Sequence, residues 1–343
     1  MTAIKTEALI IGAGPVGLFQ VFELGLLNIH THIVDALPQP GGQCAELYPE
    51  KPIYDIPACP EISAQQLIDN LLQQIAPFKA DFHLQELVTE LRSQENGRFE
   101  VITSNGTRFD TATVVLAAGL GPFQPRRLRL VDADKFEGKQ INYKVGDKSV
   151  YTGKRVAILG GGDSALDWVL ELADTCAHIH LIHRREEYRG QPASVSKMRE
   201  LVSQGKVTEH YGNISSLLTD NNKLSGLKLR LKNTEEKNLM IDSVLVFWGM
   251  SPNLGPIADW GLELEKRQLP VDTEKFQTNI PGIFAVGDIN TYPGKKKLIL
   301  SGFHEAALAA FAIQAHLDPD TKVRLQYTTT SSVMHQRLGL KED

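Results

Sequence analysis

Two glycine-rich turns have the composition of phosphate-binding sites. The first is Gly12-Ala13-Gly14-Pro15-Val16-Gly17 and the second is Gly160-Gly161-Gly162-Asp163-Ser164-Ala165. In such a turn the first glycine permits a sharp bend, the second lets the backbone approach a pyrophosphate, and a third Gly or Ala lets the next helix pack closely. The helix then directs free N–H groups at the phosphates. The expected dinucleotide contacts are Gly12, Gly14, Pro15 and Gly17 in the first turn and Gly160, Gly162, Asp163 and Ser164 in the second.

A single glycine-rich turn is weak evidence for a dinucleotide site, but here the two turns share a longer spacing. In both copies an apolar run ends 23 positions after the first glycine of the turn. The residue at this position is Asp35 in the first copy and His183 in the second. A carboxylate accepts hydrogen bonds from a free ribose hydroxyl and repels a 2′-phosphate, whereas guanidinium groups bind a phosphate through two parallel hydrogen bonds. Because Arg184, Arg185 and Arg189 follow His183, the second copy predicts NADP(H) and the first predicts FAD or NAD. The alternative for the arginine cluster is a solvated loop.

The elements that position both turns follow a strand–turn–helix–strand order. Apolar runs of strand type precede the turns, at 8–11 and 156–159, and helical patterns follow them, from 18 and 166 onward. This order predicts an α/β fold with two Rossmann-like, three-layer dinucleotide-binding domains. Further local patterns predict a capping box of Ser63 and Gln66 at a helix start, a hairpin turn at Asn105-Gly106 and a second hairpin over 227–241.

The composition is that of an ordinary globular protein and excludes several functional classes. The chain has 343 residues, with 36 Lys+Arg against 41 Asp+Glu and a formal net charge of −5, so it lacks the basicity of nucleic-acid binders. No apolar run approaches the roughly 18 residues that span a membrane, and the strand-like N-terminal run leaves no room for a signal peptide. Cys44, Cys59 and Cys176 are the only cysteines, which fits a reducing cytosol. We therefore expect a cytoplasmic protein that binds neither nucleic acid nor membrane.

Longer motifs resemble those of flavoproteins with two dinucleotide-binding domains. The stretch 278–288 resembles their C-terminal flavin motif, in which the last residue, here Asp288, holds the ribityl chain. Gly119 and Gly249, each at the end of an apolar run, resemble two further signatures of that group. The chain resembles the thioredoxin-reductase-like flavoproteins over nearly its whole length, and within them the ferredoxin–NADP reductases. The segments that carry this second resemblance are 40–43 (PGGQ), 47–49 (LYP), 163–168 (DSALDW) and 327–331 (YTTTS).

The resemblance implies FAD at the first site and NADP(H) at the second, with hydride transfer between nicotinamide and flavin N5 and no catalytic side chain. It places an FAD domain at 1–120 and 285–343, with an NADP(H) domain, 121–284, inserted between the two parts. Tyr48 and Tyr327 become candidates to stack on the isoalloxazine ring, with a partly buried packing role as the alternative. The flavin contacts that it implies are Gly12, Gly14, Pro15, Gly17, Asp35, Gln43, Tyr48, Val88, Phe123, Asp288 and Thr329, and the NADP(H) contacts are Gly160, Gly162, Asp163, Ser164, His183, Arg184, Arg185 and Arg189.

The sequence contains no cysteine pair placed for redox chemistry. The stretch that corresponds to the C-x-x-C of thioredoxin reductases, 136–143, lacks cysteine, and the glutathione-reductase spacing places Pro49 where a partner of Cys44 would be. We interpret the three cysteines as packing residues, and we find no His/Cys spacing typical of a metal site. Electrons are therefore expected to leave reduced FAD directly for an external acceptor.

The acceptor that the resemblance implies is ferredoxin or flavodoxin, and the same resemblance suggests a homodimer. Because both carriers are usually acidic, the 295–297 lysines and the 126–129 arginines are candidate docking residues, with solvated loops as the alternative. His304 and Glu305, near the start of an apolar helix, are expected to cap or pack rather than to transfer protons. The competing functions are a broad NADPH diaphorase or disulfide reductase and a non-catalytic dinucleotide sensor.

Overall fold

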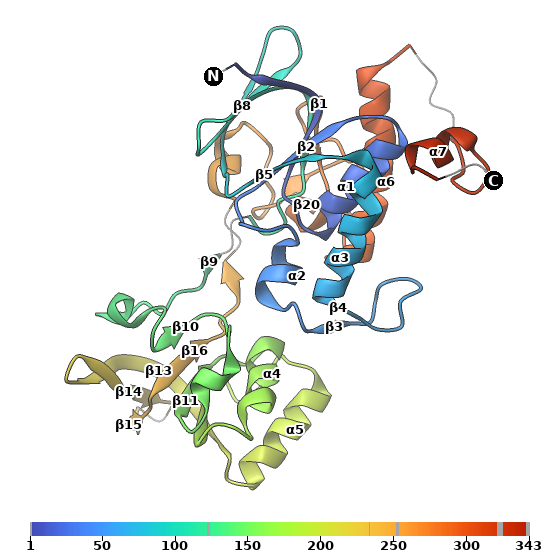
Figure 1. Ribbon diagram of the computed structural model, residues 1–343. Coiled ribbons are helices and arrows are strands. Elements are labelled where there is room, and N and C mark those ends of the chain that lie inside the picture. The colour runs from blue at the N-terminus through green and yellow to red at the C-terminus, as the bar shows by residue number, and fades with distance from the viewer. Residues whose placement is uncertain (1, 122–123, 233, 252–253, 321–324, 341–343) are drawn as a thin grey trace. The chain divides into compact units, whose positions relative to one another are not determined.

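The computed structural model describes residues 2–121, 124–232, 234–251, 254–320 and 325–340, and the chain divides into two compact units (Figure 1). Unit 1 combines Met1–Pro122 with Pro252–Asp343, and unit 2 is the continuous stretch Phe123–Ser251. The predicted α/β class, with one dinucleotide-binding unit inserted in a discontinuous other, is confirmed. Unit 1 resumes at 252 and not at the predicted 285, because side chains such as Leu254 and Ile257 pack into a core of unit 1.

Unit 1 is built on a sheet that is parallel in its centre and antiparallel at one edge. Strands β5, β2, β1, β8 and β19 are parallel to their neighbours, while β6 and β7 extend the sheet in antiparallel fashion from β8. The strands, in sheet order, are β5 (Asp81–Leu84), β2 (Thr31–Asp35), β1 (Ile4–Ile11), β8 (Arg108–Leu116), β7 (Phe99–Thr103) and β6 (Val88–Ser93), with β19 (Ile283–Ala285) also pairing with β8.

Successive side chains of β1 enter two different cores because a strand alternates its faces. Ala8 and Ile10 pack in the core that also holds α1 (Pro15–Leu26), α3 (Ala64–Ile75) and α6 (Ile299–Leu317), which lie together in Figure 1. Leu9 and Ile11 join a second core with side chains of β6, β7 and η4 (Gly255–Asp259). The sheet of unit 1 is therefore the middle of three layers, as predicted.

Unit 2 repeats this arrangement. Val156 and Ile158 pack with α4 (Asp163–Leu172) and α5 (Pro192–Ser203), whereas Ala157 and Leu159 pack with side chains of an antiparallel extension. The strands, in sheet order, are β10 (Ile141–Asn142), β16 (Ser243–Val246), β11 (Arg155–Leu159), β12 (His178–His183), β13 (Val207–Asp220), β14 (Lys223–Leu231) and β15 (Glu236–Met240), of which β13, β14 and β15 are antiparallel.

The local predictions are confirmed with one correction. Both hairpins form, since β7 and β8 flank Asn105-Gly106 and β14 pairs in antiparallel fashion with β15 between Gly226 and Met240, close to the predicted 227–241. Ser63 Oγ caps α3 by accepting a hydrogen bond from Gln66 N at 3.1 Å, but the Gln66 amide donates to Asn70 instead of completing a capping box. The remaining short elements are α2 (Gly42–Leu47), β3 (Pro52–Ile53), β4 (Ile62–Ser63), η1 (Ala76–Phe78), β9 (Gln124–Pro125), η2 (Ala133–Phe136), η3 (Lys148–Tyr151), β17 (Met250–Ser251), β18 (Leu269–Pro270), η5 (Gly287–Ile289), β20 (Asn290–Thr291) and α7 (Ser332–Arg337).

Within the described residues, no helix combines the length and the apolar character that crossing a bilayer would require.

Glu23 is an ionisable side chain that α1 carries into a largely buried environment. Its carboxyl forms no hydrogen bond or ion pair among the described residues, and burial raises its pKa from 4.5 to about 7. A carboxyl whose pKa is raised in the folded state binds a proton that the unfolded chain has already released. Stability is therefore greatest below pH 4.5 with respect to this group, and it falls as the pH rises through about 7.

We expect Glu23→Gln to remove this pH dependence. A pKa shift of this size corresponds to about 3 kcal/mol of unfolding free energy. As the pH rises from about 5 to about 8, the unfolding free energy of the variant should therefore increase by about 2–3 kcal/mol relative to that of the wild-type chain. Urea denaturation at several pH values measures this difference. The control is the same change at the exposed Glu274. Parallel pH profiles for wild type and Glu23→Gln would contradict the assignment.

Candidate functional site

The first glycine turn has no room for side chains at two of its positions. A Cβ on Gly12, whose φ is +111°, would lie 2.5 Å from Ala117 O, and a Cβ on Gly17 would lie 1.9 Å from Gly12 O. At Gly14 the nearest atom to such a Cβ would be 4.0 Å away, so the backbone there is open. Helix α1 starts with neither a side-chain cap nor an acidic residue in its first turn. Its free N–H groups are therefore available to an anion.

Asp35, at the end of β2, is tied directly to this turn. Its Oδ2 accepts a hydrogen bond from Ala13 N at 2.6 Å, and its Oδ1 accepts one from Leu37 N at 2.8 Å. Burial raises the pKa of Asp35, and these two hydrogen bonds oppose that rise. Each oxygen keeps a further lone pair. The carboxylate therefore both fixes the turn and can accept hydrogen bonds from ribose hydroxyls.

The segment before and within α2 folds onto the same turn. Gly41 N donates to Ala13 O at 2.8 Å, and a Cβ on Gly119 would lie 3.8 Å from Gln43 Nε2. Tyr48, just after α2, lies with its hydroxyl 3.7 Å from Cys44 Sγ. Burial is the main cause that raises the pKa of Tyr48, and the neighbouring Cys44 raises it further. The structure thus places Gly14, Asp35, Gln43 and Tyr48 around the carboxyl end of β1, where the sequence analysis expected a cofactor.

Asp288 belongs to the same group through the preceding glycine. A Cβ on Gly287 would contact Val16, in the first turn of α1, at 3.5 Å. The Asp288 carboxylate is half-buried and accepts no hydrogen bond from the described residues. Burial raises its pKa, and the charges of Lys297 and Lys295 oppose this. A sheltered carboxylate with unused lone pairs fits a ligand rich in hydroxyl groups, such as the ribityl chain of FAD.

A buried ion pair supports the Asp288 loop. Glu305, in α6, is 0% exposed and its Oε2 accepts hydrogen bonds from Gly287 N at 2.7 Å and Asn290 Nδ2 at 2.9 Å. Its Oε1 accepts from Tyr292 Oη at 2.9 Å and from Lys295 Nζ at 2.5 Å. The Lys295 ammonium also donates to Gly287 O at 2.8 Å. Every oxygen of the carboxylate is therefore used to hold the loop.

This network corrects one expectation and supports another. Lys295 was expected among the exposed docking lysines, but its side chain is only 6% exposed because it is paired with Glu305. Lys296 and Lys297 remain exposed. Glu305 has the packing role that was expected of it. The contributions of Asn290 and Tyr292 were missed, since no local pattern relates them to a glutamate later in the chain.

The remaining predicted flavin contacts lie in different surroundings. Val88 is buried at the start of β6. Tyr327 is 66% exposed and Thr329 is also exposed, both in the segment before α7. Phe123 lies outside the described residues. The structure therefore groups the predicted flavin contacts near the first glycine turn with Asp288. The two predicted contacts in the segment before α7 face solvent.

In unit 2 the second glycine turn has the same construction. A Cβ on Gly160 would lie 2.6 Å from Phe247 O, whereas a Cβ on Gly162 would meet nothing within 4 Å. Helix α4 has no side-chain cap. Asp163 Oδ1 accepts from Gln191 N at 2.8 Å and Arg189 N donates to Gly161 O at 2.7 Å. Asp163 is thus used to hold the 189–191 segment against the turn.

The basic residues after β12 form an unpaired cationic group. The His183 ring lies against Gly161 and stacks on Tyr188 with ring centroids 5.4 Å apart, and its Nδ1 lies 2.7 Å from Arg185 O. These contacts fix the backbone that carries the arginines. The guanidinium groups of Arg184, Arg185 and Arg189 are exposed and form no ion pair with any described residue. They are free to bind a phosphate, which Asp35 at the equivalent position of unit 1 would repel.

The cysteines have the environment of packing residues. Cys44 is 1% exposed and Cys176 is half-buried, with its Sγ donating to Tyr151 O at 3.4 Å. Burial raises the pKa of both thiols, which lowers the fraction of reactive thiolate at neutral pH. All three cysteines, including the half-buried Cys59, are free thiols.

Comparison with known proteins identifies relatives over nearly the full chain. The sequence profile of the family described as "Pyridine nucleotide-disulphide oxidoreductase" matches residues 6–312. A ferredoxin–NADP reductase 2 of Cupriavidus metallidurans is 56% identical over 338 residues, which cover 98% of this chain and 92% of the relative. A ferredoxin–NADP reductase of Methylibium petroleiphilum is 52% identical over 342 residues, covering 98% of this chain and 93% of the relative.

Among solved structures, the thioredoxin reductase of Lactococcus lactis superposes with a TM-score of 0.77 at 21% identity, over 91% of this chain and 99% of that one. This similarity establishes the fold alone.

We expect Glu305→Gln to destabilise unit 1 strongly, because it leaves the buried Lys295 ammonium without its counter-charge. Breaking one partner of a buried pair typically costs about 3–5 kcal/mol. The double variant Glu305→Gln/Lys295→Met should lose less than Glu305→Gln alone, since no unpaired charge remains buried. Denaturant unfolding of the three proteins measures the coupling. Equal stability of wild type and Glu305→Gln would show that the pair does not hold the Asp288 loop.

Proposed function

The chain belongs to the pyridine nucleotide-disulphide oxidoreductase family, and we propose that it passes electrons between NADPH and ferredoxin through a bound FAD. The observation that carries this proposal is the chemical difference between its two dinucleotide sites. One site presents the carboxylate of Asp35, and the other presents the unpaired guanidinium groups of Arg184, Arg185 and Arg189 at the equivalent place. Relatives that are 52–56% identical and are named ferredoxin–NADP reductases support ferredoxin as the acceptor.

We assign FAD to unit 1. The open backbone at Gly14 and the free N–H groups of α1 would bind its pyrophosphate, and Asp35 would bind its adenosine ribose. Asp288 would bind the ribityl hydroxyls, and Tyr48, whose pKa the charge of Asp288 helps to raise, would pack on the ring system. When bound, FAD would supply two-electron acceptance from a nicotinamide and one-electron release to a carrier. The roles of Tyr327, Thr329, Val88 and Phe123 remain part of this proposal.

We assign NADP(H) to unit 2. Gly160 and Gly162 would let the backbone approach the pyrophosphate at the start of α4, and the arginines after β12 would bind the 2′-phosphate. His183 would act through its contacts with Gly161 and Arg185, which hold the turn and the basic segment together. Asp163 would be a positioning residue, because its carboxylate is used by Gln191 N.

The cysteine environment favours a one-electron carrier over a protein disulfide as acceptor. Burial raises the pKa of Cys44 and Cys176, which lie in different units. The exposed Lys296 and Lys297, which follow the Asp288 loop, are our candidates for docking an acidic carrier, together with the exposed Arg126 and Arg129. Arg127 is paired with Glu137 at 3.1 Å. Flavodoxin as an alternative carrier, a homodimer and a cytoplasmic location are further parts of the proposal.

The experiment that tests the function is turnover of the purified, flavin-loaded protein with ferredoxin, flavodoxin and thioredoxin as alternative acceptors. We expect NADPH to bleach the flavin and ferredoxin-coupled cytochrome c reduction to exceed thioredoxin reduction. The variant with all three cysteines changed to serine should retain this activity while FAD content stays full. Loss of turnover in that variant would place a thiol on the electron path, and absence of flavin bleaching would favour a dinucleotide sensor.

The arginines after β12 should decide coenzyme preference. Changing Arg184 and Arg185 to glutamine should raise the Michaelis constant for NADPH at least about tenfold, because losing a charge-assisted contact costs about 1.5–3 kcal/mol. The Michaelis constant for NADH should change little, since NADH has no 2′-phosphate. Steady-state kinetics with both coenzymes measure the ratio. An unchanged ratio, or equal use of both coenzymes by the wild-type protein, would contradict the assignment.

A further inference from the structure

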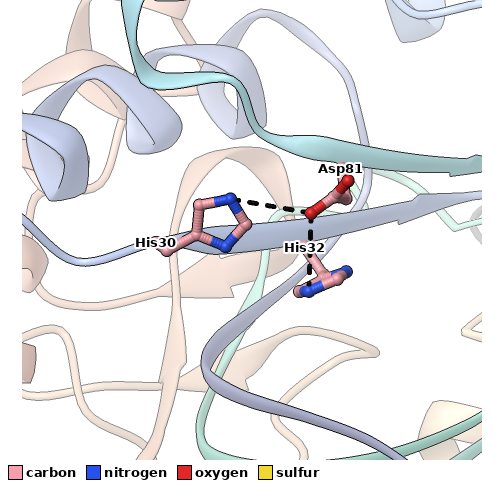
Figure 2. A group of neighbouring side chains, drawn as sticks. All are labelled: His30, His32 and Asp81. Atoms are coloured by element: carbon pink, nitrogen blue, oxygen red, sulfur yellow. Dashed lines mark ion pairs between the residues drawn. The ribbon is translucent and has the colours of Figure 1, made fainter.

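Two histidines and an aspartate meet at the edge of the unit 1 sheet, at the end of β2 opposite to Asp35. His30 immediately precedes β2, His32 is its second residue, and Asp81 begins the edge strand β5 (Figure 2). Asp81 Oδ2 lies 3.6 Å from His30 Nε2 and 3.6 Å from His32 Nε2. One ligand atom from each residue lies within 4.8 Å of the other two. Among the described residues this is the only such group of three or more metal-ligating side chains.

The two separations between Asp81 and the imidazoles are close to those of ligands around a small divalent cation. Zn²⁺ bonds to imidazole nitrogen and carboxylate oxygen are about 2.0–2.2 Å long, which places neighbouring ligand atoms of a tetrahedron about 3.3–3.5 Å apart. The observed 3.6 Å between Asp81 Oδ2 and each imidazole Nε2 needs only a small rotation of the exposed side chains. The strand pairing itself sets this distance, since β2 and β5 place His32 directly opposite Asp81.

A neighbouring histidine orients one of the rings. His32 Nδ1 lies 3.1 Å from His83 Nε2, so a hydrogen bond there directs the other nitrogen of His32 toward Asp81. Hydrogen bonds to the second ring nitrogen commonly orient histidine ligands. The His32 side chain is 13% exposed, whereas those of His30 and Asp81 are 53% and 56% exposed. A cation could therefore enter from solvent. His30 Nε2 also lies 3.3 Å from Lys79 O, a contact that a cation would replace.

Unit 2 carries the same histidine pattern without the carboxylate. His178 and His180 stand at the same offset from Gly160 as His30 and His32 from Gly12. There the residue opposite His180 is Thr208 rather than an aspartate, and its Oγ1 bonds to His178 Nε2 at 2.9 Å. Among the described residues, His178 and His180 belong to no such metal-ligating group, so they offer a matched control within the same chain.

We propose that His30, His32 and Asp81 bind one divalent cation of the Zn²⁺ class, with water completing its coordination. Two imidazoles with one carboxylate suit Zn²⁺ and related transition metals, whereas Mg²⁺ and Ca²⁺ favour ligand sets of oxygen alone. The bound cation joins the beginning of β2 to the edge strand β5. Because these ligands meet only in the folded chain, binding stabilises the folded state. The site lies at the far end of β2 from Asp35 and has no part in electron transfer.

The first test is titration of ZnCl₂ into the full-length, flavin-loaded protein after removal of metals with a chelator, in competition with a chromophoric chelator. We expect one Zn²⁺ per chain, undisturbed by excess Mg²⁺. Asp81→Asn and His30→Gln, both at exposed positions, should weaken binding at least about tenfold. The control variant His178→Gln should bind as the wild type does. Wild-type affinity in both Asp81→Asn and His30→Gln, or displacement by Mg²⁺, would overturn the proposal.

The second test is thermal unfolding with and without ZnCl₂. The wild-type protein and His178→Gln should unfold at a higher temperature with Zn²⁺, and Asp81→Asn should show no such shift. NADPH-dependent turnover should be the same in Asp81→Asn and the wild type. A Zn²⁺-dependent shift that persists in Asp81→Asn, or disappears in His178→Gln, would place the cation elsewhere and overturn the assignment.

Discussion

The closeness of α1 to the end of β1 is the constraint on which the first site depends. A Cβ on Gly17 would lie 1.9 Å from Gly12 O, and a Cβ on Gly12 would lie 2.5 Å from Ala117 O, so the helix can start where it does only if both positions lack a side chain. This start directs the N–H groups of α1 toward the carboxyl ends of β1 and β2, where Asp35 ends its strand. The Asp35 carboxylate accepts from Ala13 N and so holds the turn in this conformation. The backbone geometry of the turn and the proposed ribose recognition thus depend on the same few contacts.

The two units show how one construction acquires two specificities. Both have a glycine at the end of the first strand, an open backbone at the start of the helix and a parallel strand alongside. They differ in the charge placed at the end of that second strand, where unit 1 has Asp35 and unit 2 has His183 followed by Arg184 and Arg185. Opposite charges at these equivalent places would favour a free ribose hydroxyl in unit 1 and a ribose 2′-phosphate in unit 2. The change would have little structural cost, because the residues lie at the margin of the turn.

The buried pair of Glu305 and Lys295 supports the loop that carries Asp288, the proposed ribityl-binding residue. The Glu305 carboxylate is fully buried, and four donors satisfy it. Complete satisfaction is what makes such a charge tolerable in an apolar core. Since one of those donors is the backbone of Gly287, α6 fixes the residue that precedes Asp288. The unused lone pairs of Asp288 are left for a ligand.

The sequence by itself determined the α/β class and the two dinucleotide units, and it supplied the candidate ribose-binding positions, because these features depend on short-range spacing. A strand, a tight turn and a helix are adjacent in the chain, so glycine positions and apolar periodicity carry their signal. The Ser63 cap and the Asn105-Gly106 hairpin were predictable for the same reason. The flavin assignment needed the longer motifs that the chain shares with a known family.

Only the tertiary structure decided which charged groups are buried and which distant residues meet. Nothing in the local sequence distinguishes Lys295 from the exposed Lys296, because the difference is a glutamate on a later helix. The return to unit 1 at 252 depends likewise on packing against strands far back in the chain. His30 and Asp81 meet because β2 and β5 pair in parallel. Register between strands that are distant in sequence is set by the packing of whole layers, and no local pattern records it.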